Sequence, residues 1–228
     1  SPSSAASDVY KRQVYKLSPS TSPIEGSLVE PLAASLEGLL KAELRPGDTL
    51  LVLGTGPMGL LQISLAKLMG ASKIIACDLL EERLEAAAKA GADVLADPRE
   101  ESLERAVLEE TGGLGVDAIL VSAGGTAMAE LTAKALELSA RGGRIVVFAG
   151  TWPPQEASLD LNLIHYGERK IVGSFIYTRE VFTRALELVE GRKVELEWLV
   201  THRLPLDEAR EGFEIVKERR GLKVALIP

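Results

Sequence analysis

Cysteine, histidine, aromatic residues and excess positive charge are all scarce in this chain. Its 228 residues include one cysteine and two histidines, and 4% of them are aromatic. A single cysteine excludes an intrachain disulfide framework and is typical of a reducing compartment, so we expect a cytoplasmic protein. The net charge is −7 and basic residues form no cluster, which argues against nucleic acid and anionic membranes as partners.

Long apolar runs are missing as well. No stretch is long enough to cross a membrane, and nothing near the start has the layout of a signal peptide. What the chain does have is 46% hydrophobic residues, enough to bury a sizeable core. We therefore expect one α/β domain with additional pieces.

The first residues do not resemble natural protein sequence. Residues 3–13 resemble a translated sequencing adapter, so we interpret 1–13 as an artefact and leave them out of the fold prediction. An adapter at this place predicts that the gene was cut there. On that expectation, the part of the protein that preceded Val14 is missing.

Three glycines follow a short apolar strand with the spacing G-x-G-x-x-G. Gly54 permits a tight turn out of the strand, Gly56 leaves room for a pyrophosphate against the backbone, and Gly59 allows close packing of the next helix. The bare spacing also occurs in tight turns that bind no nucleotide. In its favour, the free N–H groups and the dipole of the following helix would meet an anion.

An acidic residue stands where such a turn requires one. A second apolar strand, Lys73–Cys77, is followed by Asp78, nineteen residues after Gly59. A carboxylate there accepts hydrogen bonds from the adenosine ribose and repels a 2′-phosphate, which favours NAD over NADP. The alternative is that Asp78 is the N-cap of the next helix, which starts near Glu81.

Short aliphatic strands and amphipathic helices alternate through the middle of the chain. The alternation predicts a doubly wound, parallel six-stranded sheet of the α/β class, with helices on both faces. The predicted strands are Leu50–Leu53, Lys73–Cys77, Val94–Ala96, Ala118–Ser122, Arg144–Phe148 and Ile171–Phe175. Helices are expected near Met58, Glu82, Ser102, Met128 and over Arg179–Glu190.

The flanking regions have a different character. Residues 14–27 are polar with two prolines and are predicted to be irregular, and a helix is predicted over Glu30–Leu44. After residue 193, a helix over Asp207–Glu218 and a closing strand over Gly221–Ile227 have no strand of their own to pair with. We therefore divide the chain into 14–44, the end of a catalytic domain and a linking helix; 45–192, the sheet domain; and 193–228, a return to the catalytic domain.

Taken together, the motifs resemble the zinc-type medium-chain alcohol and polyol dehydrogenases, especially the sorbitol and threonine dehydrogenase branch. The resemblance covers nearly everything from Val29 to Pro228. It implies a C-terminal fragment with a Rossmann domain and remnants of a chaperonin-cofactor-like catalytic domain. The matching segments are Glu30-Pro31-Leu32-Ala33, Pro46-Gly47-Asp48, Gly54 to Leu60, Asp78 to Leu84, Gly91-Ala92-Asp93, Gly142-Gly143-Arg144, Gly173-Ser174-Phe175 and Thr201-His202-Arg203.

The resemblance also implies roles for individual residues. The glycine turn would hold the pyrophosphate of NAD, Asp78 with Arg83 the adenosine ribose, and Met58 would back the nicotinamide ring. Each single position could equally serve plain packing, and Arg83 could be a solvated helix residue. The expected cofactor-binding residues are Gly54, Thr55, Gly56, Pro57, Met58, Gly59, Asp78, Arg83, Ala149, Gly150 and Ser174.

The zinc ligands of the family are the one feature of the resemblance that we do not find in this chain. In the family a zinc ion binds the substrate oxygen as a Lewis acid, held by three protein ligands that precede the Rossmann domain. Only Glu30 matches a family position beside the zinc or its water, and it could equally be a carboxylate at a helix N-terminus. His165 and His202 are interpreted as structural, and with Cys77 far from both no metal triad is expected.

The leading hypothesis is the NAD-binding part of a zinc-dependent dehydrogenase acting on a secondary alcohol or polyol, inactive alone. Alternatives are a zinc-free quinone or enoyl reductase, which Asp78 disfavours, a non-catalytic nucleotide-binding module, and a methyltransferase of related topology. We expect a homodimer or homotetramer of the full-length protein through the edge strand Ile171–Tyr177. Exposed apolar surface is expected along the helix Glu30–Leu44 and on the tail after Val194.

Overall fold

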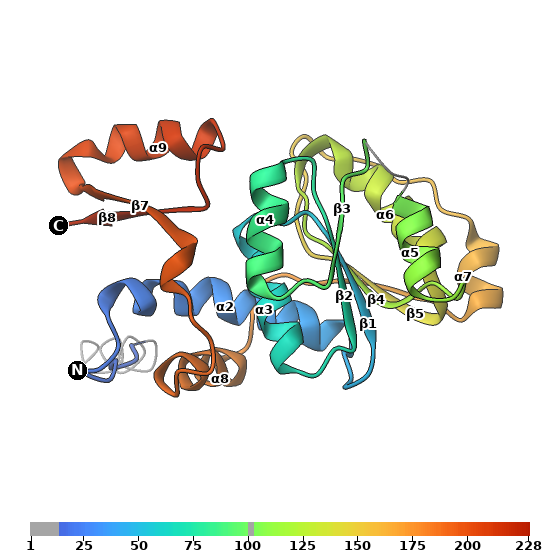
Figure 1. Cartoon of the computed structure of the whole chain (residues 1–228), viewed down its shortest axis with the longest axis horizontal. Helices are drawn as coiled ribbons and strands as arrows, with labels where there is room; N and C mark the ends of the chain where they lie inside the picture. Colours follow the sequence, from blue (N-terminus) through green and yellow to red (C-terminus); the bar gives the residue numbers. More distant parts are fainter. Residues whose placement is uncertain (1–13, 100–102) are drawn as a thin grey trace, which may run out of the picture.

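The computed structural model describes residues 14–99 and 103–228. The predicted adapter at residues 3–13 lies outside the described residues. Two parts are visible in Figure 1: a large sheet flanked by helices, and a small two-stranded sheet with one helix near the C-terminus.

The large sheet confirms the predicted α/β class. All six strands are parallel, in the order β3-β2-β1-β4-β5-β6. The strands are β1 Thr49–Leu53, β2 Lys73–Cys77, β3 Val94–Ala96, β4 Val116–Val121, β5 Ser139–Val147 and β6 Lys170–Gly173. β5 begins five residues earlier than predicted, because Ser139 pairs with Val116 ahead of a register shift that precedes the apolar part of the strand.

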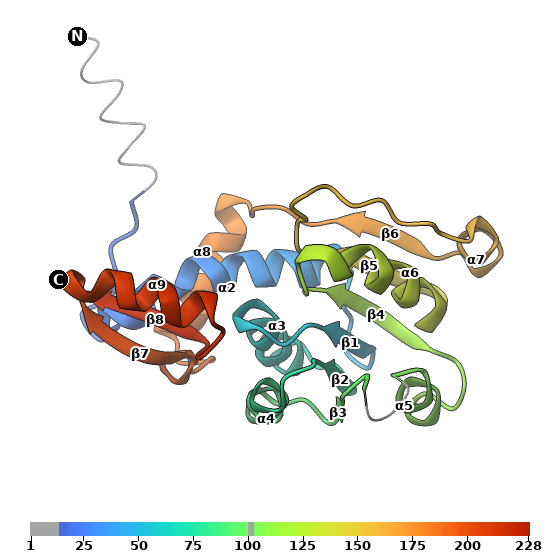
Figure 2. The same cartoon turned by 90° about the horizontal axis from the view of Figure 1, so that it is seen from above.

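Helices cover both faces of this sheet. Alternate residues of β1 point to opposite sides, so Leu50 and Val52 join one hydrophobic core while Leu51 and Leu53 join the other. The first core is covered by α2 Pro23–Lys41, α3 Pro57–Leu68, α4 Glu81–Ala90 and α8 Arg179–Glu190. The second is covered by α5 Leu103–Glu110, α6 Met128–Leu138 and α7 Leu161–Gly167, with a short 3-10 turn, η1 Gly125–Ala127, before α6 (Figure 2).

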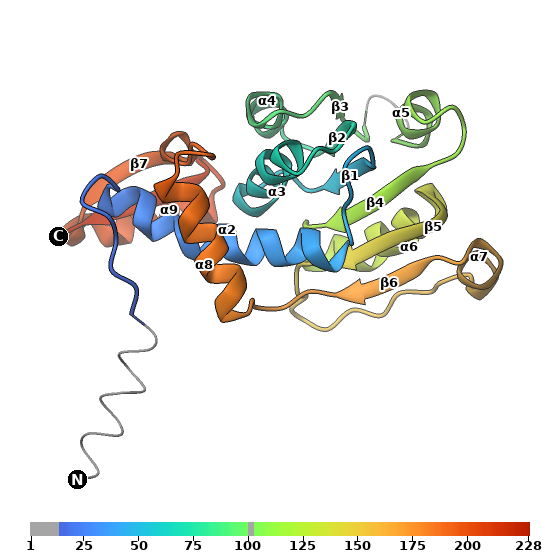
Figure 3. The same ribbon diagram turned by 90° about the horizontal axis from the view of Figure 1, so that it is seen from below.

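The first helix, α2, is longer and better covered than predicted. It begins at Pro23 rather than Glu30, because Ser22 and Glu25 form a capping box around its N-terminus. The prediction that residues 23–27 are irregular is therefore wrong. Leu28, Leu32 and most other apolar residues of this helix are buried against α3 and α8 (Figure 3), so the expected exposed apolar face is reduced to Leu40.

The tail has the predicted closing strand and, beside it, a second strand that the sequence did not predict. Strands β7 Val200–Pro205 and β8 Lys223–Ile227 are parallel and joined through α9 Ala209–Lys217. The prediction that the tail has no strand to pair with is therefore wrong. Two 3-10 turns, η2 Glu197–Leu199 and η3 Leu206–Glu208, flank β7. Phe213 and Val216 of α9 remain exposed, which agrees with the predicted apolar surface on the tail.

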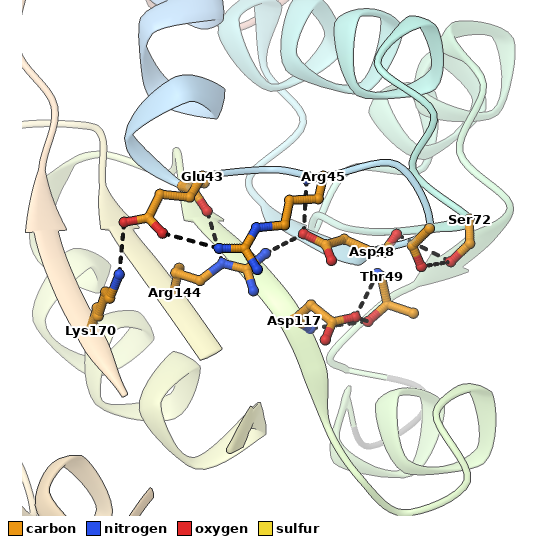
Figure 4. A network of polar contacts seen from close by, with 10 residues as sticks. Glu43, Arg45, Asp48, Thr49, Ser72, Asp117, Arg144 and Lys170 are labelled. Carbon is orange, nitrogen blue, oxygen red and sulfur yellow. Dashed lines mark hydrogen bonds and ion pairs between the residues drawn. The ribbon is translucent and has the colours of Figure 1, made fainter. Parts of the chain in front are cut away.

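A polar network closes the edge where the six strands begin (Figure 4). The buried Arg144 side chain forms an ion pair with Asp48 and donates from Nε to the carbonyl oxygen of Ala42 at 3.0 Å. Beside it, Asp117 accepts from the backbone N–H of Thr49 at 2.8 Å and from its hydroxyl at 2.7 Å. These bonds join the starts of β1 and β4 to the middle of β5, where its apolar part begins, at the amino edge of the sheet.

Candidate cofactor site

The glycine turn lies at the opposite, carboxyl edge of the sheet. Gly54 has a φ of +97°, and a Cβ there would approach the backbone nitrogen of Ala123 to 2.5 Å. A Cβ on Gly59 would lie 2.1 Å from the carbonyl oxygen of Gly54. On Gly56, in contrast, it would meet only the Arg83 guanidinium within 4 Å among the described residues. Two glycines therefore serve close packing, and Gly56 leaves backbone open to a ligand.

The helix that follows the turn has no side-chain cap. Ser22, Asp160 and Thr178 each cap a helix with a side-chain oxygen, at the starts of α2, α7 and α8. The N-cap of α3 is Gly56, which has no side chain to offer, and its first turn carries no acidic residue. The first N–H groups of α3 are therefore available to an anion, which the helix dipole favours.

Asp78 is bound directly to the glycine turn. Its Oδ2 accepts the backbone N–H of Thr55 at 2.8 Å, and its Oδ1 accepts that of Leu80 at 3.1 Å. The Arg83 guanidinium lies 3.7 Å from Oδ2, and the Arg83 carbonyl accepts from the buried Thr55 hydroxyl at 3.3 Å. The N-cap of α4 is Leu80, so the alternative that Asp78 is that N-cap is wrong.

The other predicted residues lie at the ends of β5 and β6. Ala149 donates its N–H to the Val121 carbonyl at 3.3 Å, and Gly150 follows it. Ser174, which is buried, donates its N–H to the carbonyl of the last residue of β5 at 3.1 Å. Met58 lies in the first turn of α3, half-buried. All of them lie at the carboxyl edge, and their contacts with a nicotinamide ring remain a prediction.

The strand order also identifies the carboxyl edge as the place where a ligand binds. The chain first builds outward from β1 through β2 to β3, and then returns to the other side of β1 with β4. In open α/β sheets, ligands bind in the crevice outside the carboxyl ends of the strands at such a reversal. The glycine turn follows β1 and Asp78 follows β2, so both border this crevice.

No metal centre is built by the part of the chain that the structure describes. It contains no group of three or more histidine, cysteine, aspartate or glutamate residues that could hold an ion. Glu30 is exposed on α2, close to the Tyr177 side chain. Burial and the nearby Glu30 raise the pKa of Tyr177. These residues do not supply the three ligands that zinc needs, and Glu30 as a ligand remains a prediction.

The two histidines and the cysteine lie on three separate elements, and the structural role predicted for the histidines stays a prediction. His165 lies on α7 with its ring 4.7 Å from that of Tyr166, and His202 lies on β7 beside Thr201. Cys77 is buried at the end of β2, where burial and the charge of Asp78 raise its pKa to about 12. A thiol with that pKa is protonated at neutral pH and is therefore a poor nucleophile.

A surface cavity of about 390 Å³ lies at the other end of α3 from the glycine turn. Lys67 and Lys89, in the last turns of α3 and α4, line it together with Trp198, and the Lys89 ammonium lies 5.0 Å above the Trp198 ring. Lysines at these positions neutralise the negative ends of the helix dipoles. We therefore assign no ligand to this cavity.

Comparison with known proteins agrees with this geometry. Residues 57–191 match the family described as "Zinc-binding dehydrogenase". The chain belongs to that family. The match confirms the resemblance to zinc-type dehydrogenases and favours it over a methyltransferase.

Relatives and solved structures of the family cover nearly the whole chain. Sorbitol dehydrogenase of Gallus gallus is 31% identical over 93% of this chain and 59% of its own length. Alcohol dehydrogenase TADH from Thermus sp. ATN1 superposes with a TM-score of 0.87 at 33% identity, over 94% of this chain and 61% of its own. A zinc-binding dehydrogenase from Sinorhizobium meliloti 1021, bound to NADP, superposes with a TM-score of 0.86 at 27% identity, over 94% and 62%. The chain thus spans about three fifths of the length of these proteins.

No helix among the described residues is both long and apolar enough to cross a membrane.

Proposed function

We propose that this chain is the NAD-binding part of a zinc-dependent oxidoreductase that transfers a hydride between a secondary alcohol or polyol and NAD. The sequence family supports the class of reaction, since its sorbitol dehydrogenase member is named for a polyol. The zinc ligands of such an enzyme would come from outside the described residues. Residues 45–192 would form the cofactor domain, and 193–228 would pack on the catalytic domain.

The hydrogen bond from Thr55 N–H to Asp78 carries the proposal. It holds a carboxylate beside the uncapped N-terminus of α3, at 2.8 Å from the turn that would cradle a pyrophosphate. A dinucleotide needs both features at once, since the amides bind the phosphates and the carboxylate binds the ribose hydroxyls. Each Asp78 oxygen uses one lone pair on the backbone and keeps another for a ribose hydroxyl.

The bound nicotinamide would accept the hydride, and the residues of this chain would orient it. Its adenosine half would lie over β2, on the side of Asp78. Its nicotinamide half would then lie over β4 to β6, where Ala149, Gly150 and Ser174 line the edge and Met58 would support the ring. Arg83, 3.7 Å from Asp78, would help to position the ribose.

Calorimetric titration with NAD and NADP tests this proposal. The useful variant is Asp78→Asn, because the amide oxygen still accepts from Thr55 while the charge is lost. We expect NAD binding to weaken about tenfold and the preference for NAD over NADP to shrink, since the repulsion of a 2′-phosphate disappears. Because one solved relative holds NADP, both cofactors are needed in the titration.

Asp97→Asn is the matched control. Asp97 follows β3 at the same edge and pairs with Arg99, so the variant has the same net charge without touching the turn. Equal losses in both variants would mean that total charge, rather than the position of Asp78, governs binding. If the wild-type chain is folded and binds neither cofactor, the proposal is wrong.

We further propose that the full-length enzyme is a homodimer or homotetramer in the cytoplasm. β6 is the outer strand of the sheet, and Phe175 and Ile176 after it are exposed. The buried Cys77 suits a reducing compartment. Light scattering tests the assembly: a Gly173→Pro variant, which removes a backbone donor of β6 that points away from β5, should lower the measured mass, and an unchanged mass would exclude pairing through β6.

A further inference from the structure

One buried polar side chain has hydrogen-bonding capacity that the fold does not use. Gln62 lies in the second turn of α3, soon after the glycine turn, and is fully buried. Its Oε1 accepts from the Ser122 hydroxyl at 2.6 Å, while its Nε2 has no partner among the described residues. Buried polar atoms without a partner are rare in proteins and call for an explanation.

The choice between the two amide orientations does not remove the problem. If the amide is turned over, Nε2 donates to the Ser122 oxygen and Oε1 loses its partner instead. In that orientation the hydroxyl proton of Ser122 becomes free to donate elsewhere. Either way, the Gln62–Ser122 pair keeps one unused polar group.

The pair lies directly behind the glycine turn. The backbone N–H groups of Ser122 and Ala123 both donate to the Leu53 carbonyl at 2.8 Å, immediately before Gly54. Ala123 is also the residue that the missing Cβ of Gly54 would strike. Through Ser122, Gln62 therefore anchors the end of β4 to α3, and the end of β4 in turn supports the turn.

We propose that Gln62 and Ser122 are a positioning pair for the nicotinamide half of the bound dinucleotide. This inference rests on the proposed function. Ser122 is half-buried at the end of β4, on the side of the crevice away from Asp78. The pair holds this wall in place, and a bound cofactor would meet it through the partly exposed Ser122, because the Gln62 side chain is fully buried.

The test compares a whole dinucleotide with its adenosine half. NAD and ADP are titrated into the full chain and into the double variant Gln62→Leu/Ser122→Ala, which removes both partners together. We expect the dissociation constant for NAD to rise about fivefold, the effect of one hydrogen bond, and that for ADP to stay within about twofold. Ser122→Thr, which keeps the hydroxyl, should bind NAD like the wild type.

The thermal stability of the double variant distinguishes a positioning pair from a pair that only supports the fold. Replacing a poorly satisfied buried pair with apolar groups leaves the Tm equal or higher, whereas a pair that only supports the fold would lower the Tm on removal. Thr132→Val is the matched control, because Thr132 is a buried hydroxyl on α6 bonded to the Met128 carbonyl at 2.7 Å, on the face of the sheet opposite to α3. It should change neither dissociation constant.

The outcomes separate this inference from the proposed function. Suppose that the wild type binds NAD. If the double variant binds NAD equally well, or if its affinities for NAD and ADP fall by the same factor, the inference about the positioning pair is wrong and the proposed function stands. If the wild type binds ADP but not NAD, the pair is wrong and only the adenosine assignment remains. If the folded wild type binds neither, both proposals fail.

Discussion

The two edges of the large sheet differ in how their polar groups are used. At the amino edge, Arg144 pairs with Asp48 and with the Ala42 carbonyl, and Asp117 accepts from the Thr49 N–H. The charged side chains there are thus bonded within the chain. At the carboxyl edge, the first N–H groups of α3 have no side-chain cap, and the Gln62 amide is only half used. Both edges end the same six parallel strands.

This difference indicates that the amino edge serves the stability of the fold and the carboxyl edge serves binding. A closed polar network contributes to folding, because breaking it leaves charges buried without partners. Unused donors contribute nothing to folding and cost stability unless a ligand completes them. We therefore expect substitutions at the amino edge to change the free energy of unfolding, and substitutions at the carboxyl edge to change affinity for the cofactor.

The largest effect is expected from Arg144→Met. The variant removes the guanidinium from the Ala42 carbonyl and from Asp48, which keeps only the Arg45 N–H, and we expect the free energy of unfolding to fall by about 3 kcal/mol. Urea denaturation measures this. Arg45→Met is the control, since the Arg45 side chain is exposed and should cost less than about 0.5 kcal/mol. A loss below about 1 kcal/mol in Arg144→Met would contradict the importance of the network.

The next effect distinguishes two glycines of one turn. Gly59→Ala places a Cβ 2.1 Å from the Gly54 carbonyl, so we expect about 2 kcal/mol of destabilisation together with weaker NAD binding. Gly56→Ala meets only the flexible Arg83 side chain, so it should leave the Tm nearly unchanged and still weaken NAD binding about tenfold. Thermal denaturation and calorimetry, applied to both variants, measure this. Unchanged NAD affinity in Gly56→Ala would exclude a pyrophosphate against this backbone.

The smallest effect is a pH dependence at the amino edge. Burial by itself raises the pKa of Asp93, but the Lys67 ammonium and the Ile74 N–H outweigh it and hold the pKa below the usual 3.8. This contribution to stability is therefore present above about pH 4 and is lost as the pH falls through the lowered value. Asp93→Asn should lose about 0.5 kcal/mol at pH 7, and the difference from the wild type should shrink as the pH falls through the lowered pKa.

Denaturation at several pH values checks this, with Glu156→Gln in an exposed loop as a charge-matched control. A difference that stays constant from pH 7 to pH 3 would mean that Asp93 acts through its shape rather than its charge.

Local pattern was sufficient for most of the fold. The period of apolar residues predicted all six strands of the sheet, and the spacing of the glycines predicted the turn that follows β1. It failed at β7, where Thr201, His202 and Arg203 interrupt the apolar pattern of a strand. The early start of α2 was predictable in principle, since Ser22 and Glu25 have the spacing of a capping box.

The sequence by itself determined the class of fold, the glycine turn and the acidic residue after β2, because each depends on residues close together in the chain. Only the tertiary structure decided that Thr55 binds Asp78, that Gln62 meets Ser122, and that Arg144 closes the other edge. These bonds join residues 23, 60 and 102 positions apart. No local periodicity encodes such pairings, because they form only when strands and helices have been packed side by side.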